Sequence, residues 1–164
     1  MDQLNRVDVE TFKSQEKTPL VIVLDNVRSM HNVGSAFRTA DAFAIDKIVL
    51  CGITATPPHR EIEKTALGAT QSVTWEYEKD SVEAIKKLKA EGFEVYAIEQ
   101  TNNSVSLETF EPVTSKKYAV VFGNEVHGVE EDIISLANGT LEIPQFGTKH
   151  SFNVSVTIGI VLWD

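Results

Sequence analysis

Short apolar runs alternate along this chain with segments whose apolar residues recur at helical spacing, and this alternation constrains the fold most strongly. The clearest run, Leu20–Leu24, is unbroken and rich in β-branched residues, which is typical of a strand buried on both faces. Strands separated by helices favour a parallel sheet flanked by helices, so we predict the α/β class. Strands are expected at residues 20–24, 47–51, 72–77, 93–98, 118–122 and 140–143.

The segments between these strands predict the helices and the domain organisation. Helices are expected from Asn32 to Ala44, between Pro57 and Gly68, over residues 81–91 and 129–137, and from Ser151 onward. Asn32 is predicted to be the N-cap of the first, because an asparagine side chain accepts hydrogen bonds from free backbone N–H groups at a helix start. One domain is predicted over residues 1–164, with an arm or short helix within residues 1–18.

The charge distribution bears on possible partners. The 164 residues carry a net charge of −9, which taken alone speaks against a protein that binds nucleic acid. Basic side chains nevertheless lie in two acid-poor stretches, 26–60 and 145–163, and they include Arg28, His31, Arg38, His59, Arg60 and Lys149. A locally basic face on an acidic body is therefore expected.

Cysteine content and hydropathy narrow the class of protein further. The single cysteine, Cys51, excludes an intramolecular disulfide framework and a cysteine-based zinc site, and we expect no bound metal. Its position at the end of an apolar run predicts a small buried thiol. The first 17 residues lack the apolar region of a signal peptide, and no apolar run approaches membrane-spanning length. We therefore expect a cytoplasmic protein without a membrane partner.

Three loops that each follow an apolar strand combine glycine with polar residues. They cover residues 26–34, 123–128 and 144–153. Loops at the carboxyl ends of strands hold the ligand sites of open parallel sheets, so we predict that these three converge on one site. The second loop lacks the Lys-Ser/Thr of a phosphate-binding P-loop and the glycine pattern of a dinucleotide site, which disfavours a flavodoxin-like nucleotide binder.

Each candidate residue in these loops also has a purely structural interpretation. Asn32 and Arg38 lie about 120° apart around their helix, and both can reach a ligand over its start. The alternative is that Asn32 only caps the helix and Arg38 pairs with a nearby acid. Glu125 is either a ligand-binding carboxylate or a solvated loop acid. Ser151 and Asn153 either bind a ligand or cap the last helix.

Taken in order, these loops resemble the three motifs of the SpoU (TrmH-type) RNA 2′-O-ribose methyltransferases of the SPOUT superfamily. The matching segments are Asn32-x-Gly34-x-x-x-Arg38-x-Ala40, Phe122-Gly123-Asn124-Glu125-x-x-Gly128 and Ile143 to Val156. The resemblance extends from about Val21 to the end of the chain. Each match alone is weak, but three in the same order, each after a strand, are specific.

The resemblance implies a fold, a cofactor and an assembly. Members fold as an α/β sheet whose C-terminal segment forms a trefoil knot, act as homodimers, and bind S-adenosyl-L-methionine (AdoMet) within the knot. By match, backbone around Gly123, Ile143 and Phe152, together with Asn153, would hold the cofactor. Phe152 replaces the usual leucine and Gln145 a common methionine, which alters the adenosine pocket without removing a polar group.

The resemblance also implies a reaction, namely methyl transfer from AdoMet to a ribose 2′-hydroxyl of tRNA or rRNA, with tRNA preferred. Arg38 matches the residue that acts on this hydroxyl, and because arginine is a poor base we expect it to orient the hydroxyl or a flanking phosphate. The other polar positions of the site match Asn32, Glu125, Ser151 and Asn153. RNA binding is assigned to Arg28, His31, Arg60 and Lys149. The rival interpretation is a non-catalytic knotted module that binds AdoMet or RNA.

Overall fold

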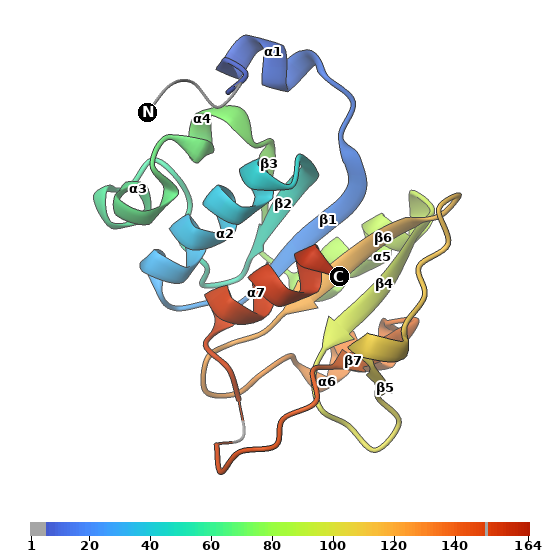
Figure 1. The fold of residues 1–164 in the computed structure, drawn as a ribbon. Helices are drawn as coiled ribbons and strands as arrows, with labels where there is room; N and C mark the ends of the chain where they lie inside the picture. The colour runs from blue at the N-terminus through green and yellow to red at the C-terminus, as the bar shows by residue number, and fades with distance from the viewer. Residues whose placement is uncertain (1–5, 150) are drawn as a thin grey trace.

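The computed structural model describes residues 6–149 and 151–164, and its centre is a seven-stranded sheet in the order β3-β2-β1-β6-β4-β7-β5 (Figure 1). The strands pair in parallel throughout, which confirms the predicted α/β class. The strands are β1 Thr18–Asp25, β2 Ile45–Cys51, β3 Trp75–Glu78, β4 Phe93–Ile98, β5 Val105–Ser106, β6 Lys117–Phe122 and β7 Gly139–Glu142. The helices are α1 Val9–Ser14, α2 Met30–Ala42, α3 Arg60–Ala66, α4 Ala69–Ser72, α5 Ser81–Ala90, the 3₁₀ helix η1 Leu107–Thr109, α6 Glu131–Leu136 and α7 Val154–Trp163.

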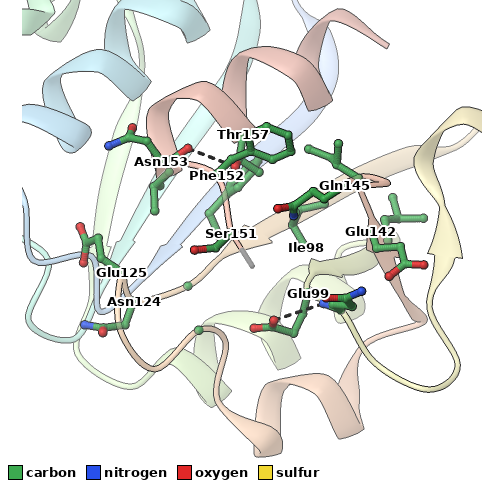
Figure 2. A pocket seen from close by; sticks show the side chains of 17 residues that line it. Ile98, Glu99, Asn124, Glu125, Glu142, Gln145, Ser151, Phe152, Asn153 and Thr157 are labelled. Atoms are coloured by element: carbon green, nitrogen blue, oxygen red, sulfur yellow. Dashed lines mark hydrogen bonds between the residues drawn. The ribbon is translucent and has the colours of Figure 1, made fainter. Parts of the chain in front are cut away.

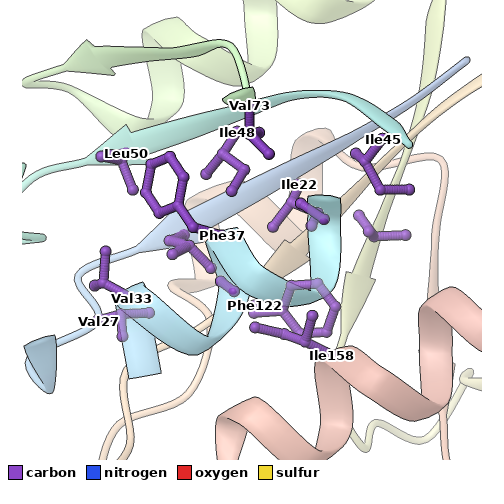
Figure 3. Close-up of a cluster of buried hydrophobic side chains, with 14 of the residues drawn as sticks. Ile22, Val27, Val33, Phe37, Ile45, Ile48, Leu50, Val73, Phe122 and Ile158 are labelled. Atoms are coloured by element: carbon purple, nitrogen blue, oxygen red, sulfur yellow. The ribbon is translucent and has the colours of Figure 1, made fainter. Parts of the chain in front are cut away.

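The central strand β1 is apolar without interruption because helices cover both faces of the sheet. Side chains alternate along a strand, so Ile22 and Val23 point to opposite faces, and both are fully buried. On the first face, Phe37 of α2 and Ile158 of α7 pack into the cluster around Ile22 (Figure 3). On the second, Val23 belongs to a separate cluster that α5 and α6 cover, to which Ile85 contributes.

Two helix starts differ from the prediction. α2 begins at Met30, because the hydroxyl of Ser29 is the N-cap and accepts a hydrogen bond from the backbone N–H of Asn32 at 3.2 Å. The predicted N-cap role of Asn32 is therefore wrong, and this residue lies inside the first turn with its side chain buried. The helix expected between Pro57 and Gly68 is confirmed as α3, whereas α4 was not predicted and starts after Gly68, which has φ +91° and is its N-cap.

The predicted strand over residues 72–77 is displaced, and a short strand and a 3₁₀ helix occur in residues 105–109, where no element was predicted. Ser72 completes α4, where its hydroxyl donates to the carbonyl oxygen of Ala69 at 3.1 Å, so β3 begins only at Trp75. Residues 105–109 form β5 and η1, and β5 exists because it pairs with β7, which no local pattern signals. In the predicted N-terminal arm, α1 buries Phe12; residues 1–5 lie outside the described residues.

Helix α7 is apolar on nearly every side although it lies at the surface. Ile158 and Val161 are buried, whereas Val156 is 50% and Trp163 80% exposed. We call the exposed stripe of Val156, Gly159, Ile160 and Trp163 the α7 face. Among the described helices, none is long and apolar enough to cross a membrane.

The strand order determines which loops meet. β6 lies between β1 and β4, and β7 lies next to β4, so the loops after these four strands share one edge of the sheet. Three of these loops are those predicted from the sequence. The fourth, after β4, was not.

Candidate active site

A pocket of about 320 Å³ opens at this edge, between the loops after β4, β6 and β7 and the start of α7 (Figure 2). Its apolar lining comes from Ile98, Phe122, Leu141, Ile143 and Val154. Its polar lining includes the carboxylates of Glu99, Glu125 and Glu142. The cofactor-binding and catalytic residues predicted from the second and third loops all line it, namely Gly123, Glu125, Ile143, Ser151, Phe152 and Asn153.

Glu125 joins the second loop to the first. Its Oε2 accepts a hydrogen bond from the N–H of Arg28 at 3.0 Å, and its Oε1 accepts from the N–H of Ser29 at 3.0 Å. Asn32 Nδ2 also donates to Oε1, at 3.2 Å. Burial raises the pKa of Glu125, but these donors together hold it below the ordinary value of 4.5. The ionised carboxylate thus stabilises the start of α2, where a negative charge is favoured.

A second set of hydrogen bonds continues from Asn32 to the third loop. The hydroxyl of Ser155 donates to Asn32 Oδ1 at 3.2 Å, and it also contacts Asn153 Oδ1. Asn153 Oδ1 accepts the N–H of Ser155 at 2.9 Å as the N-cap of α7, so the capping interpretation of Asn153 is correct. Asn153 also lines the pocket, so capping and ligand contact are compatible. We call the chain Glu125–Asn32–Ser155–Asn153 the motif network.

The second loop is held in a tight turn by its own backbone. Asn124 and Gly128 exchange two backbone hydrogen bonds of 3.0 and 2.9 Å, and Gly128 has φ +69°. A Cβ atom on Gly123 would lie 2.2 Å from the carbonyl carbon of Gly128. Glycine at position 123 is therefore required by the close approach within the loop.

Glu99, in the loop after β4, is the main site residue that the sequence analysis missed. Its Oε2 accepts a hydrogen bond from the N–H of Val129 at 3.1 Å, and its Oε1 accepts one from the N–H of Gln100 at 3.2 Å. Because Val129 directly follows the second loop, Glu99 stabilises the end of that loop. The available signal was an acid directly after the apolar run 93–98. Glu142 also lines the pocket, and it lies across it from Glu125 (Figure 2).

Comparison with known proteins shows which family the chain belongs to. The model of the SpoU rRNA methylase family matches residues 19–163. The chain belongs to the SpoU family. The resemblance drawn from the three loops is thereby confirmed.

Relatives in the SpoU family include enzymes named for two kinds of RNA. The tRNA (guanosine(18)-2′-O)-methyltransferase of Thermus thermophilus is 30% identical over 99% of this chain and 81% of its own length. The 23S rRNA (guanosine-2′-O-)-methyltransferase RlmB of Vibrio parahaemolyticus is also 30% identical over 99% of this chain, which spans 64% of that protein.

Solved SpoU structures share the fold. The AdoMet-bound rRNA methyltransferase from Sinorhizobium meliloti superposes with a TM-score of 0.83 at 28% identity, covering 90% of this chain and 56% of that one. The TrmH/SpoU tRNA modifying enzyme of A. aeolicus gives a TM-score of 0.81 at 28% identity, covering 94% of this chain and 77% of that one.

The first SpoU motif is only partly at the pocket. Arg38 is exposed on α2 and is not among the pocket-lining residues. Within residues 6–149 and 151–164 it forms no hydrogen bond or ion pair, and Asp41, one turn further along, instead accepts from the hydroxyl of Ser72 at 2.6 Å. Asn32 reaches the pocket indirectly, through Glu125 and Ser155.

The residues predicted to bind RNA lie outside the pocket. The side chains of Arg28, Arg60 and Lys149 are exposed. The ring of His31 lies 3.0 Å from a carboxylate oxygen of Glu61, which offsets positive charge on that histidine. In the described part of the chain, no group of three or more His, Cys, Asp or Glu side chains is placed to hold a metal ion.

Proposed function

We propose that this chain is an AdoMet-dependent methyltransferase that methylates a ribose 2′-hydroxyl of tRNA. The observation that carries the proposal is the motif network, which joins all three SpoU motifs beside one pocket. Its links connect residues up to 123 positions apart. Two reactants that must meet in line need such fixed groups around them.

The pocket suits AdoMet on chemical grounds. AdoMet supplies a methyl group on a positively charged sulfonium. Apolar side chains such as Ile98 and Leu141 offer surface for its adenine, and the carboxylates that line the pocket favour a cationic ligand. We assign cofactor binding to Gly123, Ile143, Phe152 and Asn153, which all line the pocket.

Because the cofactor carries the activated group, the task of the protein is to orient the ribose. We assign to Arg38 the orientation of the 2′-hydroxyl or of a flanking phosphate, since its guanidinium stays protonated and is a poor base. Glu125 and Asn32 hold the start of α2, the helix that carries Arg38. Ser151 and Asn153 lie at the pocket itself. The hydroxyl proton leaves late in the transfer.

The preference for tRNA over rRNA is supported by the extent of the matches. The tRNA methyltransferase from Thermus thermophilus is covered over 81% of its length, whereas the rRNA methyltransferase RlmB from Vibrio parahaemolyticus is covered over 64%. We further propose that the exposed Arg28, His31, Arg60 and Lys149 contact the RNA backbone, which makes binding sensitive to salt.

We propose that the protein acts as a homodimer through the α7 face. A second copy would bury apolar side chains such as Val156 and Trp163, which otherwise face water. The family resemblance alone supports a further proposal, a trefoil knot in the C-terminal segment. We also propose the cytoplasmic location that the hydropathy of the sequence favours.

Transfer of tritium from labelled AdoMet into total tRNA and, separately, into rRNA tests the proposed function. We expect label in tRNA, and we expect Arg38→Ala to abolish it while AdoMet affinity, measured by calorimetry, stays nearly unchanged. A fully active variant would remove Arg38 from the mechanism. AdoMet binding without label in either RNA pool would instead favour the non-catalytic binding module.

A further inference from the structure

Phe146 is the most exposed large apolar side chain among the described residues, with 96% of its surface in contact with solvent. It lies in the segment between β7 and α7, which extends away from the sheet (Figure 1). Its neighbour in sequence Gln145, and Ser151 beyond it, line the pocket. An entire phenyl ring held in water beside a ligand pocket indicates a contact made in a complex.

The position of Phe146 argues against two other roles. It is not among the residues that line the pocket, so it does not cover the cofactor. Its neighbours in sequence, Gln145, Gly147, Thr148 and Lys149, are also all exposed, and none has a large apolar side chain that would extend an apolar surface from the ring. The core of a subunit interface is instead a continuous apolar patch.

The chemistry around Phe146 fits a nucleic acid. No acid occurs between Glu142 and Asp164 in the sequence, and Lys149 lies three residues after the ring. Single-stranded RNA is bound by aromatic side chains that stack on unpaired bases and by cations beside them that contact phosphates. The ring is open to a ligand, since 96% of the surface of Phe146 is exposed.

We propose that Phe146 is a stacking platform for a nucleobase of the RNA substrate, with Lys149 contacting a neighbouring phosphate. This inference rests on the proposed function, because it takes the pocket beside Phe146 to be the site of ribose methylation. Stacking uses the face that every base presents, so this contact positions the strand without selecting one base.

Substitutions at position 146 separate stacking from simple apolar contact. Binding of total tRNA at low salt, measured by fluorescence anisotropy, should weaken about 5- to 150-fold in Phe146→Ala. Phe146→Leu should recover little of this loss, because leucine has apolar surface but no π face, and Phe146→Trp should bind at least as tightly as the unchanged protein. Val113→Ala removes a half-exposed apolar side chain before β6, at the opposite edge of the sheet, and should leave binding unchanged.

AdoMet affinity by calorimetry and molar mass by light scattering should stay the same in all four variants. Unchanged tRNA affinity in Phe146→Ala, or full recovery in Phe146→Leu, would overturn the inference. Loss of AdoMet affinity or of the dimer would do so as well, by showing that the ring covers the cofactor or contacts a subunit. Methyl transfer by the unchanged protein tests the proposed function separately, since the binding series can succeed or fail whether or not label is transferred.

Discussion

At the scale of single residues, the hydroxyl of Ser155 links the pocket to the helix that carries Arg38. It has one proton and lies within hydrogen-bonding distance of two amide oxygens, Asn32 Oδ1 and Asn153 Oδ1. The opposite end of Asn32 is fixed by Glu125, and Asn153 Oδ1 also accepts a backbone N–H. The two oxygens therefore share one donor, and a displacement of Asn153 by a ligand changes the bonding of Asn32.

Ser155→Ala should lower kcat for methyl transfer about fivefold while changing the AdoMet dissociation constant by less than about twofold, because one hydrogen bond contributes roughly 1 kcal/mol. Steady-state kinetics and calorimetry give the two values. Ser135→Ala is the matched control, since that serine also lies in a helix and donates only to the carbonyl oxygen of Glu131, at 3.0 Å. An unchanged kcat would show that Asn32 keeps its position without Ser155.

The ionisation of Glu125 makes the stability of the protein depend on pH. Its folded pKa lies below the ordinary value of 4.5, so it contributes stability above pH 4.5 and loses that contribution as pH falls through the lower folded value. Glu125→Gln should reduce the free energy of unfolding at pH 7 by roughly 1 kcal/mol, since solvent weakens these partly exposed bonds. The deficit should shrink on acidification below pH 4.5.

Urea unfolding of both proteins at pH 7 and pH 3.5 measures this difference. Glu108→Gln, at an exposed position in η1, is the control and should match the unchanged protein at both pH values. A deficit for Glu125→Gln that is as large at pH 3.5 as at pH 7 would contradict the role of the ionised carboxylate.

At the scale of the elements, Gly123 is needed for the shape of the second loop as well as for the pocket that it lines. A larger side chain would clash with the loop itself, because a Cβ atom at this position would lie 2.2 Å from the Gly128 carbonyl carbon and 2.3 Å from the Val129 nitrogen. Gly123→Ala should therefore lower the free energy of unfolding by about 1–3 kcal/mol and weaken AdoMet binding at the same time.

Thermal unfolding and calorimetry follow these two effects of Gly123→Ala. Gly147→Ala, at a position where a Cβ atom meets nothing within 4 Å, should change neither. Weaker AdoMet binding at unchanged stability would show that the added methyl group acts in the pocket and not on the turn.

The elements also show what the sequence could predict. Continuous apolar runs located β1 and β6 within a few residues, because strands buried on both faces have an unmistakable composition. β5 was not predicted, because a strand of two residues shows no periodicity in the sequence and forms only through its pairing with β7. Asn32 was misplaced as an N-cap because Ser29, three residues earlier, is an equally good cap.

The candidate site was also predicted in part, because some of its residues follow from local sequence and others depend on strand pairing. Motif spacing placed Glu125, Ser151 and Asn153 at one pocket, since each follows a strand whose end lies at the same edge. Glu99 belongs to none of the motifs. Its role, and the hydrogen bonds of Glu125 to α2, depend on which strands are neighbours, and that is decided by the packing of the whole sheet.

At the scale of the whole molecule, the proposed dimer depends on the α7 face. Val156→Glu should convert the proposed dimer to monomers at about 10 µM, because a charge in the core of an interface loses its water without a partner. Size-exclusion chromatography with light scattering measures the mass. Val7→Glu, at a similarly exposed valine before α1, should remain dimeric, and dimeric Val156→Glu would place the interface elsewhere.

The motif network has a consequence for how the molecule acquires its activity in time. Its bonds between Asn32 and Glu125 and between Asn32 and Ser155 join residues 93 and 123 positions apart. The first half of the chain alone contains none of these pairs, and closing such long loops is slow compared with forming helices. Methyl transfer should therefore return last during refolding, after helical circular dichroism has recovered, so that activity reports a completely folded chain.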